Sequence, residues 1–437
     1  MLTITTNKNA FAESIVLAAV LAFFCFLPHN ASAATYYLPD NCANFSACFQ
    51  MMNGGDTLIV RDGIYLNAYM MDPPSGTAQN PTRIISEHDG GVIVDLNFNT
   101  SVPGSYDAAV IISTSHVDLE GFKFLNGQEA VGIFAGGNIN IRRCAFGNSF
   151  GGTYDSVVLV TGNNILIEDS WMWGQGRAMI QASGTSLTFR RIVMRNDYYP
   201  GEHESTGILL YGAKNVIVEN AIALDFNPAT TTSHSRCGFR SREGYEAVNH
   251  NFYGCISLNL PNTPNGGYWG FELAVANAKN CVAWDVARQG FVQEGWNASY
   301  SIDHCTAGNT GLGYDINNMP VINSSNNPVG ISNFLNLGQG ANIMNRYVNG
   351  IETSQPLWPW TYEDRIKADF QQSFQNIPAQ YGNAARGFAA NGNGLYGGPI
   401  TLTSYIWEYL GNPCPQNICN ATPDEEAPSS PRGLSVN

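Results

Sequence analysis

The sequence predicts an all-β solenoid, a stack of short coils, with a small helical cap near the C-terminus. Three observations predict it. The 437 residues are 44% hydrophobic and only 13% charged, so the chain can bury a large core. Its 45 glycines and many asparagines separate short runs of Val, Ile, Leu and Phe, which is typical of short strands joined by turns. Segments of one design recur every 22 to 34 residues, and helix signals begin only after residue 335.

The N-terminal residues have the pattern of a secretory signal. A polar segment precedes an apolar one over residues 15–27, and small residues follow at Ala31 and Ala33. The apolar segment is too short to span a bilayer, and no later stretch is a candidate span. We therefore expect residues 1–33 to be a signal peptide. The mature chain is then secreted or periplasmic and makes no membrane contact once the signal is removed.

The chain is acidic, with a formal net charge of −14. Nucleic acids and anionic membranes need a concentrated basic surface, which this composition disfavours. The sequence contains no GxSxG elbow, phosphate-binding glycine loop, HExxH or paired CxxC motif, so serine esterases, nucleotide-binding proteins and zinc enzymes lack support. These observations exclude partner classes without naming one, and the oligomeric state stays open.

The cysteines are informative because an exported chain can form disulfides. Removal of the signal also removes Cys25, which leaves nine cysteines. Cys42 and Cys48 flank a short loop at one end of the folded region, and Cys414 and Cys419 do the same at the other end. The spacing predicts two local disulfides, Cys42–Cys48 and Cys414–Cys419.

The first predicted strand lies in GGDTLIVRDGIYLN, residues 54–67, between two glycine turns, and later segments such as HVDLEGFKF and NILIEDSWMW repeat a strand, a tight corner and a strand. The apolar residues before the corners align in one column, Leu119, Ile141, Ile167, Phe189, Val218, Phe252, Ala278 and Ile302. The residues three positions later form the next column, Phe122, Cys144, Ser170, Ile192, Ala221, Cys255, Cys281 and Cys305. The cysteines in this column are therefore predicted to be small core residues.

A second strand in each coil is predicted from segments aligned on Gly132, Gly207, Gly238, Gly270, Gly290 and Gly313. Because side chains alternate along a strand, the next residues should point inward, namely Ile133, Ile208, Phe239, Phe271, Phe291 and Tyr314. Their neighbours should point outward, in a row of Phe134, Leu209, Arg240, Glu272, Val292 and Asp315. A row beside it contains Tyr211, Arg242, Ala274, Glu294 and Asn317.

These patterns resemble those of the secreted right-handed parallel β-helix proteins of the pectate-lyase-like superfamily. The stretch from GGDTLIVRDGIYLN through GTAQNPTRIISEHDGGVIVD is similar to their first coils, and within the superfamily it is nearest to the group of chondroitinase B and alginate lyases. The resemblance covers about residues 36 to 335. It implies a right-handed parallel β-helix, which we place at residues 34–335.

The resemblance also implies β-elimination on a uronate-containing glycan. That group typically uses a Lys base and an Arg, whereas residues 234–250 offer Arg240 and Arg242 and contain no Lys. Pectate lyases, with an Arg base beside acidic calcium ligands, resemble this arrangement more closely. The expected catalytic residues are Arg240, Arg242, Glu272 and Glu294, and the expected Ca²⁺ ligands are Glu272, Glu294 and Asp315.

Two alternatives use the same residues. In a glycoside hydrolase, Glu272 and Glu294 would be an acid and a base or nucleophile roughly 5 to 9.5 Å apart. In a non-catalytic glycan-binding or structural surface protein, Arg240 would simply pair with Glu272, and Arg242 with Glu294, as a surface ladder. Exposed ion pairs of that kind stabilise a protein little, by about 0 to 1 kcal/mol.

Aromatic and titratable side chains near this zone are candidates for sugar contact, because the C–H face of a sugar ring is apolar. The expected substrate-binding residues are Tyr211, His234, Tyr245, Tyr268 and Trp296.

Helix signals mark the C-terminal region. Thr361 can cap a helix in YEDRIKADFQQSF, whose apolar residues recur every four positions, and a second helix is predicted in TSYIWEYLG. We expect residues 336–420 to form a cap over the open end of the solenoid. Residues 421–437 are rich in Pro, Ser and acidic residues and are predicted to be disordered.

Overall fold

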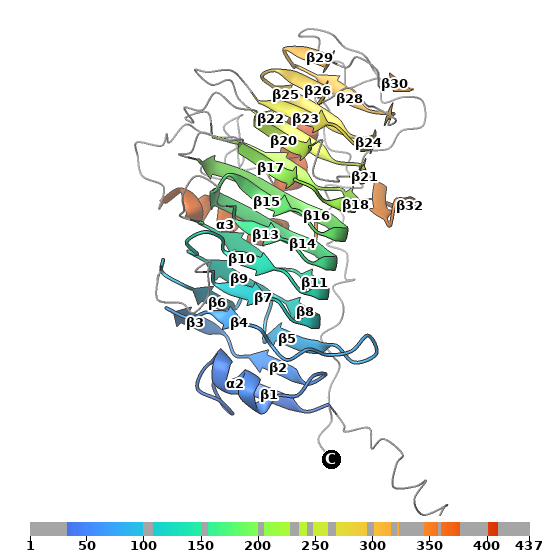
Figure 1. The fold of residues 1–437 in the computed structure, drawn as a ribbon. Coiled ribbons are helices and arrows are strands. Elements are labelled where there is room, and N and C mark those ends of the chain that lie inside the picture. Colours follow the sequence, from blue (N-terminus) through green and yellow to red (C-terminus); the bar gives the residue numbers. More distant parts are fainter. Residues whose placement is uncertain are drawn as a thin grey trace, which may run out of the picture. The chain divides into compact units, whose positions relative to one another are not determined.

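The chain is a parallel β-helix, seen here in a computed structural model. About nine coils stack in one direction, and helices are few and short within the described residues (Figure 1). The predicted fold class is therefore confirmed. The structure describes residues 33–98, 108–149, 156–199, 205–227, 236–242, 248–260, 268–294, 301–315, 321–322, 345–356, 360–375 and 401–409.

The coils form two long parallel sheets, one of 20 strands and one of 10 strands. The larger sheet contains β1 (Thr35–Leu38), β2 (Thr57–Val60), β3 (Gly63–Leu66), β5 (Thr82–Ser86), β6 (Val92–Asp95), β8 (Ser115–Glu120), β9 (Phe122–Leu125), β11 (Gly137–Arg142), β12 (Ala145–Gly147), β14 (Asn163–Gln175), β16 (Thr185–Tyr198), β18 (Lys214–Glu219), β19 (Ile222–Leu224), β21 (Val248–Tyr253), β22 (Ile256–Leu260), β24 (Ala276–Lys279), β25 (Val282–Val286), β27 (Ile302–Asp303), β28 (Thr306–Gly308) and β30 (Val321–Ile322). The smaller sheet contains β4 (Met70–Met71), β7 (Val110–Ile112), β10 (Gly132–Phe134), β13 (Val158–Val160), β15 (Ala178–Ala182), β17 (Ser205–Leu210), β20 (Arg236–Ser241), β23 (Trp269–Leu273), β26 (Gln289–Gln293) and β29 (Leu312–Asp315).

The core lies between the two sheets and consists of side chains stacked from coil to coil. The column predicted from Leu119 to Ile302 is in register and buried throughout. In the smaller sheet, the ring of Phe271 stacks on those of Phe239 and Phe291, each at 4.8 Å between centroids. The column of small residues is also confirmed, because four of its members are fully buried free cysteines, namely Cys144, Cys255, Cys281 and Cys305.

Tight corners in the coils are made by residues with left-handed backbone conformation, most of them asparagine or aspartate. Asn tolerates this conformation, and its side chain can hydrogen-bond locally. Asn164, with φ of 54°, donates to Asn138 of the preceding coil at 3.4 Å, and Asn259, with φ of 51°, donates to Asp225 at 2.6 Å. The abundance of asparagine in the sequence therefore reflects the repeated corner.

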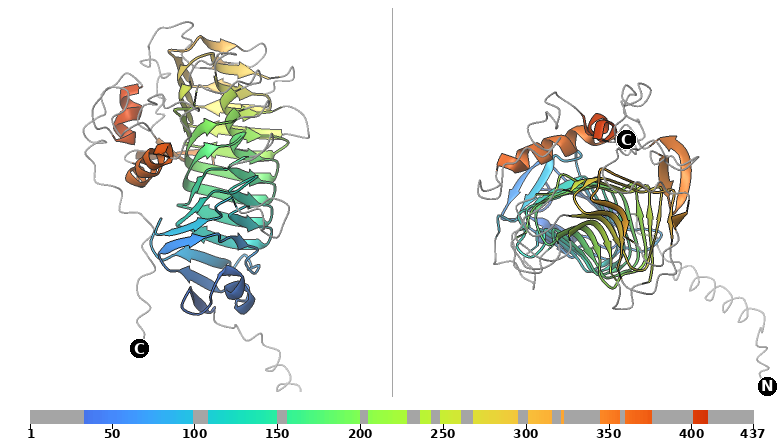
Figure 2. Two further views of the ribbon diagram at one scale, coloured as in Figure 1. Left: turned by 90° about the vertical axis from the view of Figure 1, so that its left-hand side faces the viewer. Right: turned by 90° about the horizontal axis from the view of Figure 1, so that it is seen from above.

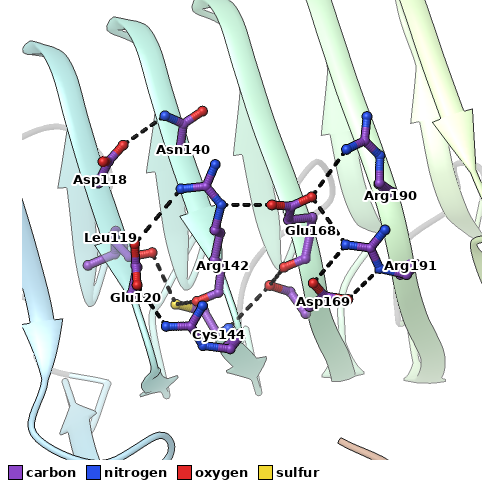
Figure 3. Close-up of polar contacts among 12 residues, drawn as sticks. Asp118, Leu119, Glu120, Asn140, Arg142, Cys144, Glu168, Asp169, Arg190 and Arg191 are labelled. Carbon is purple, nitrogen blue, oxygen red and sulfur yellow. Dashed lines mark hydrogen bonds and ion pairs between the residues drawn. The ribbon is translucent and has the colours of Figure 1, made fainter. Parts of the chain in front are cut away.

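The outer face of the larger sheet carries a ladder of alternating charges (Figure 3). Arg142 pairs with Glu120 at 3.8 Å and with Glu168 at 2.7 Å. Arg190 then pairs with Glu168 at 3.3 Å and with Glu219 at 2.7 Å. Because parallel coils bring these positions into register, each charge lies between two opposite charges. A ladder of the kind considered for the candidate site thus also occurs on the larger sheet.

One predicted strand alignment is wrong by one residue. Phe134 was expected to point outward and Ile133 inward. Phe134 is instead fully buried and packs edge-on against Phe146 in the core, while Ile133 pairs with Leu159 in the outward row. Gly132 occupies the inward position that Ile208 takes in a later coil, so aligning the segments on the glycine shifted this strand.

The C-terminal helices lie along the side of the β-helix (Figure 2). Helix α3 (Glu363–Gln375) is anchored by Asp369, which pairs with Lys123 and accepts a hydrogen bond from Trp171 Nε1 at 2.8 Å. Helix α4 (Leu402–Tyr409) is anchored by Tyr405. The predicted helices therefore exist, but their expected position across the open end of the solenoid is wrong.

The helices lie on the side because the β-helix has an apolar outer face there. Outward residues of the larger sheet and apolar residues of α3 and α4 form a second hydrophobic cluster, which includes Trp171, Trp173, Val193, Ile222, Ile256, Val282, Trp360, Ile366, Phe370, Leu402 and Ile406. Burial of this surface drives the docking. A short antiparallel hairpin of β31 (Asn345–Val348) and β32 (Ile351–Pro356) also docks on the coils, where Tyr347 stacks on Tyr253 with centroids 5.4 Å apart.

Helix α2 (Phe45–Met51) lies between β1 and β2 in the sequence, and Asn44 caps it by accepting a hydrogen bond from the backbone of Ala47. A disulfide joins Cys42 to Cys48, with Cα atoms 5.2 Å apart, so this predicted pairing is confirmed.

Several predictions concern residues outside the described ranges. They are the signal peptide over nearly all of residues 1–33, the disulfide Cys414–Cys419 and the tail 421–437. Within the described ranges, no helix has the length and apolar character needed to cross a membrane.

Candidate functional site

The predicted site residues lie on the outward face of the smaller sheet, in β17, β20, β23 and β26. The strand register aligns Leu209, Arg240, Glu272, Val292 and Asp315 in one row, as predicted, and Leu209 in this row is fully buried. Adjacent strands of a sheet lie about 4.8 Å apart, so side chains of neighbouring coils in this row can touch.

Local packing explains why the polar side chains point outward. A Cβ on Gly270 would lie 2.6 Å from Ala283 Cβ and 2.5 Å from the Gly290 carbonyl oxygen, so no larger residue fits there. A Cβ on Gly238 would likewise clash with the side chain of Ser257. In β20 and β23 the glycine thus approaches the core, and the phenylalanine that follows it is buried there. Arg240 and Glu272 come next and point to the opposite side.

Arg240 is the centre of a buried ion-pair cluster on this face. Its Nε lies 2.9 Å from Glu272 Oε2, and its Nη2 lies 2.8 Å from Glu294 Oε1. Arg240 is only 4% exposed and Glu272 only 5% exposed, whereas the Glu294 side chain is 24% exposed. Removing one partner would leave a buried charge without compensation, so we expect disruption of this cluster to cost more than disruption of an exposed ion pair.

Cys237 belongs to the same cluster. Its Sγ donates a hydrogen bond to Glu272 Oε2 at 2.9 Å. Burial, and next the nearby Glu272 carboxylate, raise the pKa of the Cys237 thiol well above its usual range. Cys237 therefore holds its proton and acts as a donor that helps to orient Glu272, a role that the sequence did not reveal.

The geometry changes the expected roles of the two arginines. Arg240, expected as a base, contacts two carboxylates, and opposite charges favour its protonated form. Arg242, expected to pair with Glu294, lies over the ring of Tyr211, with Cζ 4.8 Å from the ring centroid. The sequence predicted one ion pair for each arginine, Arg240 with Glu272 and Arg242 with Glu294. In the structure Arg240 pairs with both carboxylates.

The residues predicted to hold calcium fit that ion poorly in this arrangement. Glu272 and Glu294 both contact the Arg240 guanidinium, which supplies the positive charge at the point where a cation would bind. Asp315 follows Val292 in register and is separated from Glu272 by a full coil. We therefore derive no chemical step through calcium.

Tyr211 lies between two guanidinium groups. Arg242 Cζ is 4.8 Å and Arg177 Cζ is 5.9 Å from the Tyr211 ring centroid. Two coils farther along, at the other end of the strands, Arg288 Cζ lies 4.9 Å from the ring of Trp269. Tyr211 and Trp269 are half-buried, and Arg288 is exposed. Such cation–π contacts leave the guanidinium able to bind an anion while the ring presents an apolar edge.

The sequence did not predict that Arg177 and Arg288 contact the rings of Tyr211 and Trp269. Each directly precedes a strand of the smaller sheet, Arg177 before β15 and Arg288 before β26. An alignment that extended each strand by one residue would place them with Arg236 at the start of β20. In β15, β17, β20, β23, β26 and the residues directly flanking them, five arginines accompany three glutamates. These strands therefore carry more arginine than glutamate on a chain of net charge −14, although Arg177, Arg236 and Arg240 are buried.

One predicted substrate-binding residue is wrong, and others lie outside the described residues. Tyr268 is fully buried, and its ring packs edge-on against Phe226 in the core at 5.5 Å between centroids, so it cannot stack on a sugar. Tyr268 is on the inward side of its strand because it directly precedes Trp269, which faces outward. His234, Tyr245 and Trp296 lie outside the described residues.

Comparison with known proteins gives a likeness of fold. No protein-family model matches this chain, and no curated protein matches it. Among solved structures, the pectate lyase Pel9A is 12% identical, with a TM-score of 0.41 over 68% of this chain and 78% of that one. An alginate lyase from a Paenibacillus species is 14% identical, with a TM-score of 0.43 over 67% of this chain and 98% of that one. A PL6 family polysaccharide lyase from Pseudopedobacter saltans is 12% identical, with a TM-score of 0.43 over 64% and 77%. No residue role is transferred from these structures.

Proposed function

We propose that this protein binds a uronate-containing polysaccharide on the outward face of β17, β20, β23 and β26 and cleaves it by β-elimination. One observation carries the proposal, namely the position of Tyr211 between the guanidinium groups of Arg177 and Arg242. This arrangement combines an anion-binding group with a ring and a hydroxyl. The excess of arginine over glutamate in these strands, on an acidic chain, supports an acidic ligand.

The binding step follows from the chemistry of these groups. A guanidinium can donate two parallel hydrogen bonds to a carboxylate, which suits the carboxylate of a uronate. The rings of Tyr211 and Trp269 present apolar surface to the C–H face of a sugar. Since Arg288 lies over Trp269, a similar pair of groups is available two coils from Tyr211, at the other end of the strands. A chain of acidic sugars could then contact successive coils.

The elimination step requires a neutralised carboxylate and a proton acceptor. Arg242 neutralises the uronate carboxylate, which makes the proton on C5 more acidic. The Tyr211 hydroxyl group, in its ionised form, takes this proton. The electron pair of the C5–H bond forms the C4–C5 double bond, and the bond from C4 to the glycosidic oxygen breaks. That oxygen takes the proton from the now neutral Tyr211 hydroxyl group, which returns to its ionised form. The products are a shortened chain and a chain with an unsaturated terminal sugar.

In this proposal Arg240, Glu272 and Glu294 position the site. The buried cluster joins three neighbouring strands, β20, β23 and the end of β26, through one guanidinium. It thereby fixes the backbone of β20, from which Arg242 projects. Calcium bound by Glu272, Glu294 and Asp315 stays a prediction, and so does export directed by residues 1–33.

Analysis of the products tests the proposal. The mature chain is incubated with alginate, pectate, chondroitin sulfate and neutral glycans, with and without calcium, and the products are identified by mass spectrometry. We expect unsaturated oligosaccharides from an acidic polysaccharide. Saturated oligosaccharides would indicate hydrolysis and return Glu272 and Glu294 to the roles of acid and base.

A non-catalytic glycan-binding protein is the second candidate. It is favoured by the Arg240 cluster, since the carboxylates expected to do chemistry are engaged in buried ion pairs. Binding of an acidic polysaccharide with no cleavage would support it. Tyr211→Phe separates the candidates, because it removes the hydroxyl group and keeps the ring. Cleavage should then fall while binding persists, and Arg83→Gln on the other sheet serves as the control.

A further inference from the structure

A second concave site lies at the corner where coils pass from the larger sheet to the smaller one. It is a groove of about 430 Å³, which is large enough for a small ligand. It is lined by Asn259, Leu260, Asp285, Val286, Ala287, Asn309, Thr310 and Gly311. These residues come from three successive coils, at the ends of β22, β25 and β28.

One wall of the groove is a rigid stack of polar corner residues. Asn259, Asp285 and Asn309 have φ values of 51°, 51° and 47°, so the same left-handed corner recurs in each coil. Asn309 Nδ2 donates to Asp285 Oδ1 at 2.8 Å, and Tyr409 of α4 donates to Asp285 Oδ2 at 3.0 Å. The docked helix α4 therefore helps to hold this wall in place. Both oxygens of Asp285 accept hydrogen bonds, which compensate its charge.

The groove also contains a polar group that lacks a partner. Thr310 is 5% exposed, and its Oγ1 has no hydrogen-bond partner among the residues that the structure describes. A buried hydroxyl without a partner destabilises the folded chain, because it has lost its hydrogen bonds to water. Because the hydroxyl of threonine can be turned by rotation about χ1, it can bond to a ligand that enters the groove. This observation is independent of the shape of the groove.

We infer that the groove is a binding site for an uncharged, hydroxyl-rich ligand, specifically a sugar of a neutral glycan. Amide, hydroxyl and backbone groups supply both donors and acceptors, as sugar hydroxyls require. The described lining residues include a carboxylate and no Lys or Arg, so an acidic sugar is disfavoured. The groove therefore differs in ligand chemistry from the face that contains Tyr211 and Arg242.

The site lies apart from the proposed site of cleavage. Ala287 lines the groove, and Glu294 of the Arg240 cluster follows seven residues later along the same coil. At about 3.3 Å per residue of strand, the two are separated by roughly 20 Å. The inference does not depend on β-elimination, and its test uses binding of neutral sugars alone.

The test measures binding of neutral hexasaccharides to the full mature chain. Hexasaccharides of cellulose, xylan and mannan are titrated separately by calorimetry, with saturation-transfer NMR as a second readout. Thr310→Val, which replaces the hydroxyl by a methyl group, should weaken binding by about 2- to 10-fold, the loss expected for one neutral hydrogen bond. Thr310→Ser, which keeps the hydroxyl, should bind nearly as well as the unaltered chain.

A matched pair of corner variants controls for local strain. Asn309→Ala alters the groove wall, and Asn164→Ala alters a corner of similar φ, 54° against 47°, far from the groove. Only Asn309→Ala should weaken binding, and thermal melting confirms that both variants fold. The inference is overturned if the unaltered chain binds none of the three hexasaccharides, or if Thr310→Val and Asn309→Ala bind them as tightly as it does. Loss of cleavage in Tyr211→Phe with hexasaccharide binding retained would show that the two sites are independent.

Discussion

Replacement of Glu272 by glutamine tests the buried cluster most sharply, because it removes one charge and preserves the shape of the side chain. Breaking a buried ion pair by removing one partner typically costs about 3 to 5 kcal/mol, since a buried charge loses its compensation. Arg240 keeps a second partner in Glu294, so we expect the lower end of this range, about 3 kcal/mol. Glu294→Gln should cost only about 1 kcal/mol, because the Glu294 side chain is 24% exposed and water can replace the lost partner.

The assay is urea denaturation followed by tryptophan fluorescence, with the free energy of unfolding compared among variants. Glu87→Gln, at an exposed ion pair with Arg61, is the matched control and should leave stability unchanged. The double variant Arg240→Met with Glu272→Gln should be less destabilised than the sum of its two single variants, since both alter the same pair. A Glu272→Gln variant within 1 kcal/mol of the unaltered chain, or one no less stable than Glu294→Gln, would contradict the reasoning.

Three further predictions concern the rest of the fold. Burial lowers the pKa of His250 from 6.5 to about 4, so protonation of this side chain favours the unfolded chain. The free energy of unfolding should therefore be highest above pH 6.5 and should fall by about 3 kcal/mol as the pH falls toward 4. His250→Gln should flatten that part of the stability-against-pH curve, and an unchanged slope would contradict it. Tyr405→Phe, which removes a donor to the buried Asp225, should cost about 1.5 to 3 kcal/mol in thermal denaturation. Burial raises the pKa of Cys144 to about 12, and mass spectrometry should find no labelling by thiol reagents in the native chain at the buried cysteines Cys144, Cys237, Cys255, Cys281 and Cys305.

The sequence predicted the fold because the repeated unit has a simple physical signature. Asparagine and glycine mark the corners, and the residues between them alternate between core and surface, so the columns containing Phe252 and Cys255 could be aligned without a structure. The same alternation placed Arg240 and Glu272 side by side on the outward face. The alignment failed at Ile133 and Phe134, where the glycine used as a marker lies one position farther along the strand.

Other features depend on contacts between distant parts of the chain. Trp171 lies at an outward position of its strand, which predicts an exposed side chain, but α3 covers it. Only the structure shows against which face of the β-helix a C-terminal helix packs. Arg240 was assigned one carboxylate partner and has two, because strand register does not determine where a long side chain ends. Cys237 gave no signal of its contact with Glu272, since a lone cysteine in a strand is most often a core residue.

The most direct test of the proposed site measures the rate at which unsaturated product is released from a uronate-containing polysaccharide by the unaltered chain and by Arg242→Gln. The ultraviolet absorbance of the new conjugated double bond gives this rate continuously. If Arg242 neutralises the carboxylate in the transition state, Arg242→Gln should slow release by about 100-fold or more while the melting temperature stays the same. Release at an unchanged rate by Arg242→Gln, or no release by the unaltered chain from any acidic polysaccharide, would contradict the proposal.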